Sequence, residues 1–140
     1  MEDNQITIQP EESYKIIRNS VLTAQAKVYT AVNSAMVQAY WEIGQEIHKA
    51  CGENDRAEYG KKLLEYLSEQ LTSEFGKGFT VTNLKYMRQF YRAFPNRHTL
   101  CDELSWSHYR LLMRVENEKT RSFYVEECVK SGWSVRQLER

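Results

Sequence analysis

The chain has 140 residues, which is enough for one domain with its own hydrophobic core. Hydrophobic residues make up 41%, charged residues 27% and aromatic residues 12%, a composition that excludes global disorder and is typical of a globular protein. The 19 Lys and Arg balance 19 Asp and Glu. Any nucleic-acid site must therefore be local, because the overall basic charge of most DNA-binding domains is absent.

The number of cysteines and the first residues of the chain indicate the cellular compartment. Cys51, Cys101 and Cys128 are odd in number and far apart, and the chain does not begin with the basic and apolar segments of a secretory signal. The longest uncharged stretch, residues 28–41, is too short to cross a bilayer. We therefore expect a cytoplasmic protein with reduced thiols and no membrane contact.

Residues 1–9 form a polar segment that we expect to be a flexible tail, and residues 10–140 are predicted to form a single helical domain. Apolar residues recur at three- and four-residue steps from Pro10 to about Ala50, which predicts one very long helix or two helices that meet near residues 29–34. We expect most of this apolar face to pack within the domain. Its length and its small residues also suit pairing with a second copy or another partner (Ala24, Ala31, Ala35, Ala39).

The next two predicted helices are bounded by capping residues. Asp55, with Glu58 three residues later, predicts the start of a helix that runs to about Phe75 and buries four side chains (Tyr59, Leu63, Leu67, Leu71). Gly76 suits the left-handed position after that helix. Thr80 is expected to cap a following helix that Pro95 ends. Residues 63–94 thus resemble a helix-turn-helix unit, although residues 75–80 make a longer turn than the standard motif has.

The C-terminal third predicts three more helices. Ser105 opens one through about Val115, Asn117 opens another through Lys130, and the S-x-x-Q sequence at residues 134–137 is a capping box that begins a last one. No strand-like alternation of useful length occurs. The predicted fold class is all-α, with five to six helices and a long N-terminal helical segment.

The helix after Thr80 carries the clearest functional signal. No acidic residue occurs between Phe75 and Asp102, while five basic residues do (Lys77, Lys85, Arg88, Arg92, Arg97). On a helix, the polar and basic residues fall within an arc of about 120° opposite the apolar ones, so we expect a water-facing ridge without carboxylates. Its cations could meet phosphates and its short polar side chains base edges. The candidate DNA-binding residues are Lys77, Thr82, Asn83, Lys85, Arg88, Gln89 and Arg92. The alternative is an ordinary solvated helix face.

Other site chemistries have weaker support. His48-x-x-Cys51 and His98-x-x-Cys101 could together bind zinc, but each pair is isolated in the sequence, and we expect no metal and no cofactor. Ser105 is expected to be a helix cap. A nucleophilic role for Ser105 or Ser107 with His108 is not expected, because neighbours on a helix cannot place a nucleophile against a base in the geometry that catalysis needs. No Asp or Glu is followed two residues later by Lys, so the chain lacks the acidic–lysine pair of PD-(D/E)xK nucleases.

Several phrases, in order, resemble the N-terminal helical domain of the YhcG-type family. They are residues 40–44 (YWEIG), 56–64 (RAEYGKKLL), 75–79 (FGKGF), 83–84 and 87–91 (NL, MRQFY), 104–112 (LSWSHYRLL), 123–124 (FY) and 133–139 (WSVRQLE). The likeness covers roughly residues 14–140. It implies a PD-(D/E)xK nuclease domain downstream in the full-length protein, absent from this chain.

A shorter resemblance links residues 104–139 to ParB-type DNA-binding domains, through one group of residues near position 108 and another near 136 (Ser105, His108, Arg110, Leu111, Leu112; Ser134, Val135, Arg136, Glu139). In those domains a helix-turn-helix precedes such phrases. We therefore expect a non-catalytic module that binds and positions duplex DNA for the nuclease domain. The alternative is a protein–protein interaction or dimerisation module, a homo-oligomer through its N-terminal helices, with no nucleic-acid contact.

Overall fold

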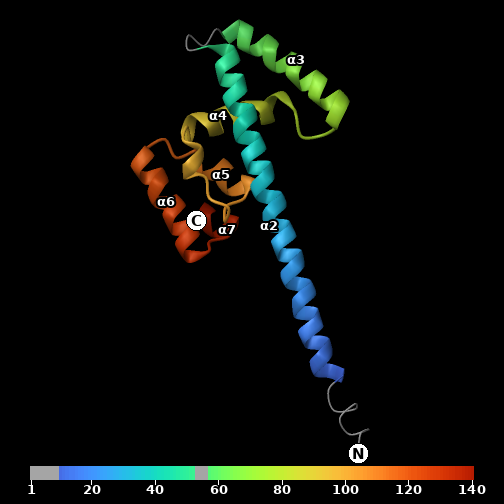
Figure 1. Cartoon of the computed structure of the whole chain (residues 1–140). Helices are drawn as coiled ribbons and strands as arrows, with labels where there is room; N and C mark the ends of the chain where they lie inside the picture. The colour runs from blue at the N-terminus through green and yellow to red at the C-terminus, as the bar shows by residue number, and fades with distance from the viewer. Residues whose placement is uncertain (1–9, 53–56) are drawn as a thin grey trace, which may run out of the picture. The chain divides into compact units, whose positions relative to one another are not determined.

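The computed structural model describes residues 10–52 and 57–140, and within them every regular element is helical (Figure 1). The elements are α2 (Pro10–Cys51), α3 (Ala57–Phe75), α4 (Val81–Ala93), a 3₁₀ turn η1 (Arg97–Thr99), α5 (Trp106–Leu112), α6 (Glu118–Ser131) and α7 (Val135–Glu139). The all-α prediction is confirmed, and the long N-terminal segment is one helix of 42 residues. The chain divides into two compact units, residues 1–32 and 33–140.

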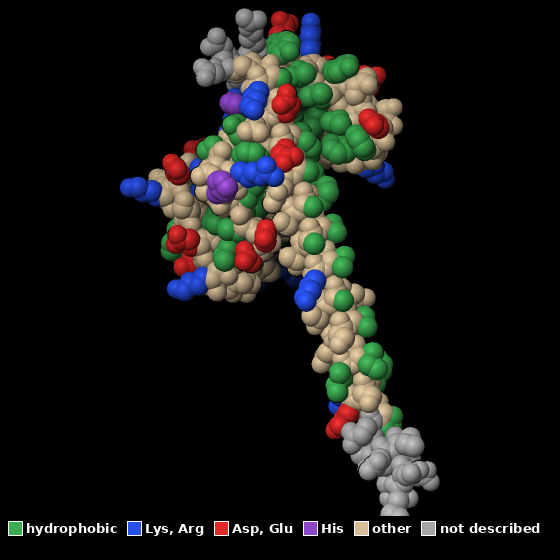
Figure 2. All heavy atoms as spheres, in the orientation of Figure 1, with side chains coloured by type: hydrophobic (Ala, Val, Ile, Leu, Met, Phe, Trp, Pro, Cys, Tyr) green, Lys and Arg blue, Asp and Glu red, His purple; other side chains and the backbone are tan. Residues whose placement is uncertain are grey.

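The described part of the first unit is the N-terminal part of α2, and it buries none of its residues. Every residue from Pro10 to Val32 is exposed, and apolar side chains such as Ile17 (61%) and Val28 (63%) are among them. Figure 2 shows hydrophobic side chains along this segment of the helix surface. The expectation that this apolar face packs within the domain is therefore wrong for residues 10–32. Sequence period identifies an apolar face but not what covers it.

The second unit has a core that begins with the C-terminal part of α2. Five residues of that part are buried (Val37, Trp41, Gly44, Ile47, Cys51). The indole Nε1–H of Trp41 donates a hydrogen bond of 2.7 Å to the carbonyl oxygen of Phe94. This bond ties α2 to the end of α4, and it satisfies a polar group that burial would otherwise leave costly.

Helix α4 lies between two hydrophobic clusters and contributes to both. Leu84 and Met87 pack with Ile47, Cys51 and Leu64 in one cluster. Phe90 and Phe94, the residue that follows α4, pack in the other cluster with residues of α2 and α6 and with residues in and beside α5 (Val37, Trp41, Leu104, Tyr109, Leu112, Met113, Cys128). Because apolar side chains on one side of α4 are buried at both ends of the helix, the rotation of α4 about its own axis is fixed.

Local signals set the ends of α3 and α4 as predicted. Gly76 follows α3 with φ of +86°, and Thr80 Oγ1 accepts a hydrogen bond of 3.1 Å from the backbone N–H of Asn83. The prediction that α3 buries Tyr59 is wrong, because Tyr59 is 51% exposed. The adjacent turn buries Leu64 instead. The predicted cap at Asp55 lies outside the described residues.

The C-terminal helices also follow their caps. Ser105 and Ser134 each form a capping box, Asn117 caps α6, and Gly132 ends it with φ of +62°. Helix α5 ends at Leu112, three residues before the predicted position. Across the described ranges, no helix combines the length and the apolar character that a membrane span requires.

Candidate nucleic-acid interface

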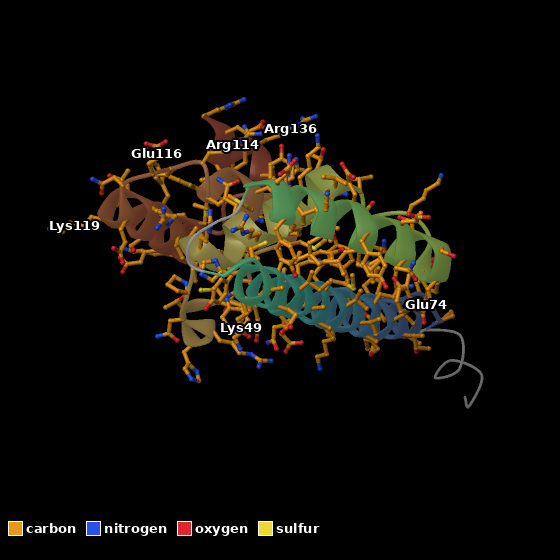
Figure 3. The ribbon with its side chains drawn as sticks, turned by 90° about the horizontal axis from the view of Figure 1, so that it is seen from above. Lys49, Glu74, Arg114, Glu116, Lys119 and Arg136 are labelled. Carbon is orange, nitrogen blue, oxygen red and sulfur yellow. The ribbon has the colours of Figure 1, made fainter. Side chains whose placement is uncertain are left out.

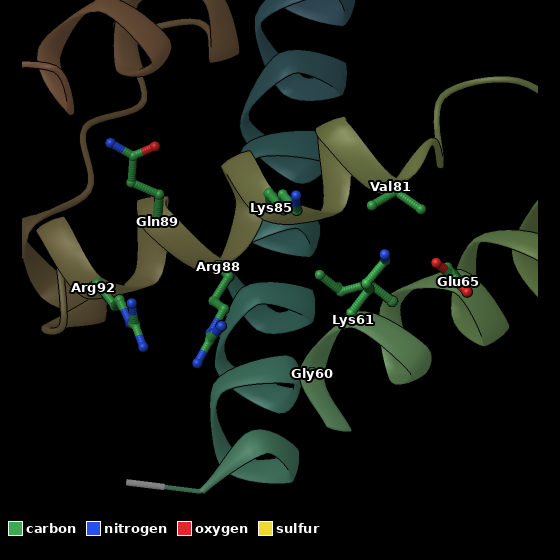
Figure 4. A pocket seen from close by; sticks show the side chains of 9 residues that line it. Gly60, Lys61, Glu65, Val81, Lys85, Arg88, Gln89 and Arg92 are labelled. Atoms are coloured by element: carbon green, nitrogen blue, oxygen red, sulfur yellow. The ribbon is translucent and has the colours of Figure 1, made fainter. Parts of the chain in front are cut away.

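A groove of about 810 Å³ lies between α3 and α4 in the second unit (Figure 4). Nine residues line it: Gly60, Lys61, Leu64 and Glu65 from α3, and Val81, Lys85, Arg88, Gln89 and Arg92 from α4. Four of these are cations and one is a carboxylate. The groove therefore concentrates positive charge over a partly apolar floor.

The contribution of α4 to the groove follows from its helical phase. Its five lining residues lie within an arc of about 100° at 100° per residue, and the buried residues Leu84, Met87 and Phe90 lie outside that arc. Burial of the apolar side in two clusters therefore directs Lys85, Arg88 and Arg92 to one surface. The sequence predicts this grouping correctly.

The shape of the surface differs from the sequence expectation. We expected a ridge without carboxylates, but α3 forms the opposite wall of a groove, and Glu65 is among its lining residues. Figure 4 shows Lys61 and Glu65 on α3 across from the basic side chains of α4. The basic face is thus recessed beside α3, which changes how a nucleic acid could approach it.

The basic side chains in the groove differ in their surroundings. Lys61, Lys85 and Arg92 are exposed, while Arg88 is half-buried. The Nε–H of Arg92 donates to Nδ1 of His48 at 3.5 Å, which links α4 to the C-terminal part of α2. Gln89 is exposed, and its Nε2 donates to the carbonyl oxygen of Met113 at 3.4 Å. Arg92 and Gln89 are therefore held by the fold at the groove edge.

Three of the predicted site residues do not line the groove. Lys77 is exposed in the turn before α4, and Thr82 is exposed in the first turn of α4. Asn83 is half-buried, and its side-chain Nδ2 donates to the carbonyl oxygen of Gly78 at 3.2 Å. This bond gives Asn83 a role in holding the turn.

Arg97 belongs to the same basic window of the sequence but not to the groove. Its guanidinium lies 3.0 Å from a carboxylate oxygen of Glu42 and donates to Oε1 of Gln38 at 3.0 Å. Arg97 therefore ties η1 to α2. One of the five basic residues between Phe75 and Asp102 thus makes a contact within the second unit.

Lys61 and Glu65 line the groove, although no pattern in the sequence predicts this. Both lie on the polar side of α3, where a charged residue is ordinarily solvated. The sequence separates Lys61 from Lys85 by a whole helix and turn, so only the packing of α3 against α4 brings them to one groove. The spacing of the α4 residues could not reveal this second wall.

The candidate zinc-binding pairs form no metal site in the described residues, and Ser105 is the N-cap of α5. No group of three or more His, Cys, Asp or Glu side chains suited to a metal forms in the described ranges. Ser105 Oγ lies 2.8 Å from His108 Nδ1, so the two side chains are closer than the sequence argument implied. They meet as a capping box, and the other ring nitrogen of His108 is 2.8 Å from the carbonyl oxygen of Trp133. The predicted cap role of Ser105 is confirmed.

Comparison with known proteins places these features in a family. Residues 16–140 match the family described as the DUF1016 N-terminal domain. The chain belongs to this family. Over 84% of its length the chain is also 33% identical to the Escherichia coli (strain K12) protein named "Putative nuclease YhcG". The predicted YhcG-type resemblance is confirmed.

This DUF1016 N-terminal domain accounts for only part of its relative. The alignment covers 40% of the length of the E. coli protein. No solved structure matches the chain.

Proposed function

We propose that this DUF1016 N-terminal domain is a non-catalytic module that binds duplex DNA and positions it for a downstream nuclease domain in the full-length protein. One observation carries the proposal: Lys61, Lys85, Arg88 and Arg92 line a single groove with one carboxylate, Glu65. Guanidinium and ammonium groups gathered in this way are the usual partners of phosphates. The name of the E. coli relative, which refers to a nuclease, agrees with a nucleic-acid target.

The recessed position of the basic face favours one mode of docking. With α3 as a second wall, α4 does not stand clear as a helix that enters the major groove must. We propose that the phosphate backbone of one strand lies along the groove, and that Lys77 adds a contact from the turn. Thr82, Asn83 and Gln89 remain the candidates for base contacts, because they lie on α4 beside the cations. Asn83 would have to give up its bond to Gly78 to take part.

Titration of duplex DNA against salt tests the proposal. Five phosphate contacts, four in the groove and one at Lys77, predict a slope of about −4.5 in a plot of log affinity against log salt, at about −0.9 per contact. Reversing two exposed cations, Lys61→Glu with Lys85→Glu, should weaken binding and reduce the slope by about two contacts, or about 1.8. Absence of binding by the wild-type chain at low salt would remove the proposal.

A matched control has the same charge change elsewhere. Lys119 lies on α6 and Arg136 on α7, both exposed, and Figure 3 shows their side chains directed away from the helices. The variant Lys119→Glu with Arg136→Glu should keep most of the wild-type slope. An equal loss in both double variants would mean that net charge, not the groove, governs binding. Circular dichroism confirms that each variant folds.

A second candidate function is self-association, and the exposed apolar side chains of residues 10–32 favour it. Apolar surface of this extent along one helix is typical of an interaction site. The two functions are compatible, because DNA-binding proteins often dimerise through a surface other than the one that contacts DNA. A monomer in sedimentation experiments at high concentration would exclude this candidate.

A further inference from the structure

The exposed part of α2 carries an apolar seam with coiled-coil spacing. Its members follow one another at alternating steps of three and four residues, as the a and d positions of three heptads do (Tyr14, Ile17, Val21, Ala24, Val28, Ala31, Ala35). The larger ones are 50–65% exposed: Val21 50%, Ile17 61%, Val28 63% and Tyr14 65%. Three heptads is the length at which this pattern begins to indicate a coiled coil.

The exposed apolar face of this segment favours a partner helix. Nine of residues 10–32 are Ile, Val, Thr or Tyr, which have lower helix propensity than Ala, Leu or Lys. A helix of this kind, exposed along its whole length, gains little from local interactions, since most helical stability in proteins comes from packing of an apolar face. Burial of the seam against another helix supplies that packing.

The seam ends where the packed part of α2 begins. The next heptad positions after Ala35 are polar or charged (Gln38, Glu42, Gln45, Lys49), whereas the buried positions of α2 follow a different register (Val37, Trp41, Gly44, Ile47, Cys51). The seam is therefore not an extension of the face that enters the core. Its apolar residues coincide with the exposed stretch of the helix.

The sizes of the seam residues indicate the partner and its direction. The first half holds Tyr14, Ile17 and Val21, and the second half is smaller, with Ala24, Val28 and Ala31. In a parallel pair, large residues would meet at one end and alanines at the other, so the helices would splay. In an antiparallel pair of identical helices, each large residue meets a smaller one, and the separation of the helices stays even.

We propose that residues 14–31 form an antiparallel coiled coil with the same residues of a second copy of this chain. Tyr14 then faces Ala31 of the second copy, Ile17 faces Val28, and Val21 faces Ala24. Such an interface uses the same patch on both subunits and closes as a two-fold dimer. The proposal rests on the second candidate function, self-association, and is independent of DNA binding.

Two neighbouring isoleucines provide a matched test of the seam. Ile17 is a seam residue, whereas Ile16 is equally apolar, 67% exposed, and displaced by about 100° around the helix. Sedimentation equilibrium of the full chain should show a dimer for the wild type and for Ile16→Asp. The dissociation constant of Ile17→Asp should rise at least about tenfold. A monomeric wild type, or equal effects of the two substitutions, would overturn the proposal.

Cysteine pairing tests the direction of the helices. Val21→Cys and Ala24→Cys are prepared as separate proteins, oxidised alone and after mixing, with the wild-type chain as the baseline for the native thiols Cys51, Cys101 and Cys128. The antiparallel pairing predicts disulfide-linked dimers above this baseline only in the mixture. Cross-linking of either variant alone, or none in the mixture while the dimer persists, would overturn the antiparallel arrangement. Neither outcome bears on DNA binding, which is measured separately with the charge-reversal variants.

Discussion

Gly44 of α2 and the peptide carbonyl of Met87 in α4 lie so close that no side chain fits between them. A Cβ atom at position 44 would be 2.7 Å from the carbonyl carbon of Met87, 3.2 Å from the backbone nitrogen of Arg88, and closer still to the Met87 oxygen. These are backbone atoms and cannot turn aside as the end of a flexible side chain can. Gly44 therefore permits the close crossing that sets α4, and with it Lys85, Arg88 and Arg92, in position.

The substitution Gly44→Ala should destabilise the protein. Ala favours a helix over Gly by about 1 kcal/mol, but the forced separation of α2 and α4 should cost more, for a net loss of roughly 1–3 kcal/mol. Urea unfolding followed by circular dichroism measures the change. Gly60→Ala in α3 is the matched control, because its Cβ would meet only Cys51 Sγ at an ordinary 3.5 Å. That variant should be neutral or slightly more stable, and equal losses at both positions would contradict the crossing argument.

The hydrogen bond between Trp41 and Phe94 yields a second prediction. Trp41→Phe keeps an aromatic ring but leaves the Phe94 carbonyl oxygen without its buried donor, so stability should fall by about 1–3 kcal/mol. Trp106→Phe is the comparison, because Trp106 packs against both hydrophobic clusters and makes ring contacts with Tyr40 and Phe90. Thermal unfolding of the two variants should show the larger loss for Trp41. A larger loss for Trp106 would mean that ring packing outweighs the hydrogen bond.

The local features of this fold could be predicted from sequence because their causes are local. Thr80, Asn117 and Ser134 accept hydrogen bonds from backbone N–H groups three residues away, and Gly76 adopts the left-handed conformation that few other residues tolerate. The common face of Lys85, Arg88 and Arg92 also follows from helical spacing alone. Each of these predictions depends on fewer than about fifteen consecutive residues.

The features that could not be predicted from the sequence depend on contacts between segments that are distant in the chain. Lys61 enters the groove only because α3 packs against α4, and Arg97 leaves the basic set only because α2 offers Gln38 and Glu42. The exposure of residues 10–32 is a further case. Their apolar period is as regular as that of a buried helix, and nothing in the period tells whether the partner is within the chain or outside it.

Arg97 tests whether DNA binding depends on the groove or on the basic stretch of sequence as a whole, because Arg97 belongs to that stretch but does not line the groove. Its ion pair with Glu42 is half exposed, with 51% and 54% of the two side chains accessible, so Arg97→Ala should change stability by no more than about 1 kcal/mol. The same substitution should leave the salt dependence of DNA binding unchanged. The comparison is Arg92→Ala, which should reduce the slope by about one contact, or 0.9. A reduced slope for Arg97→Ala would place the DNA path outside the groove.

Stability should fall as the pH rises above about 9, because the core holds protonated thiols and a phenol. Burial raises the pKa of the Cys128 thiol, and burial together with the charges of Glu103 and Asp102 raises that of Cys101, both from 9.0. Burial also raises the pKa of Tyr109 well above 10.0. Above the pKa values of the unfolded chain, the unfolded chain releases protons that the folded chain keeps. The stabilisation is therefore full below the unfolded pKa values and is lost as the pH rises toward the folded pKa values. The loss is at most about 1.4 kcal/mol per pH unit for each group. Urea unfolding at pH 8, 9, 10 and 11 measures this loss of stability.

Tyr109→Phe should be less stable than the wild type throughout, because the Cys101 N–H loses its acceptor at 2.7 Å. The decline in its stability above pH 10 should, however, be shallower than that of the wild type. A wild-type stability that stays constant from pH 8 to 11 would contradict the prediction.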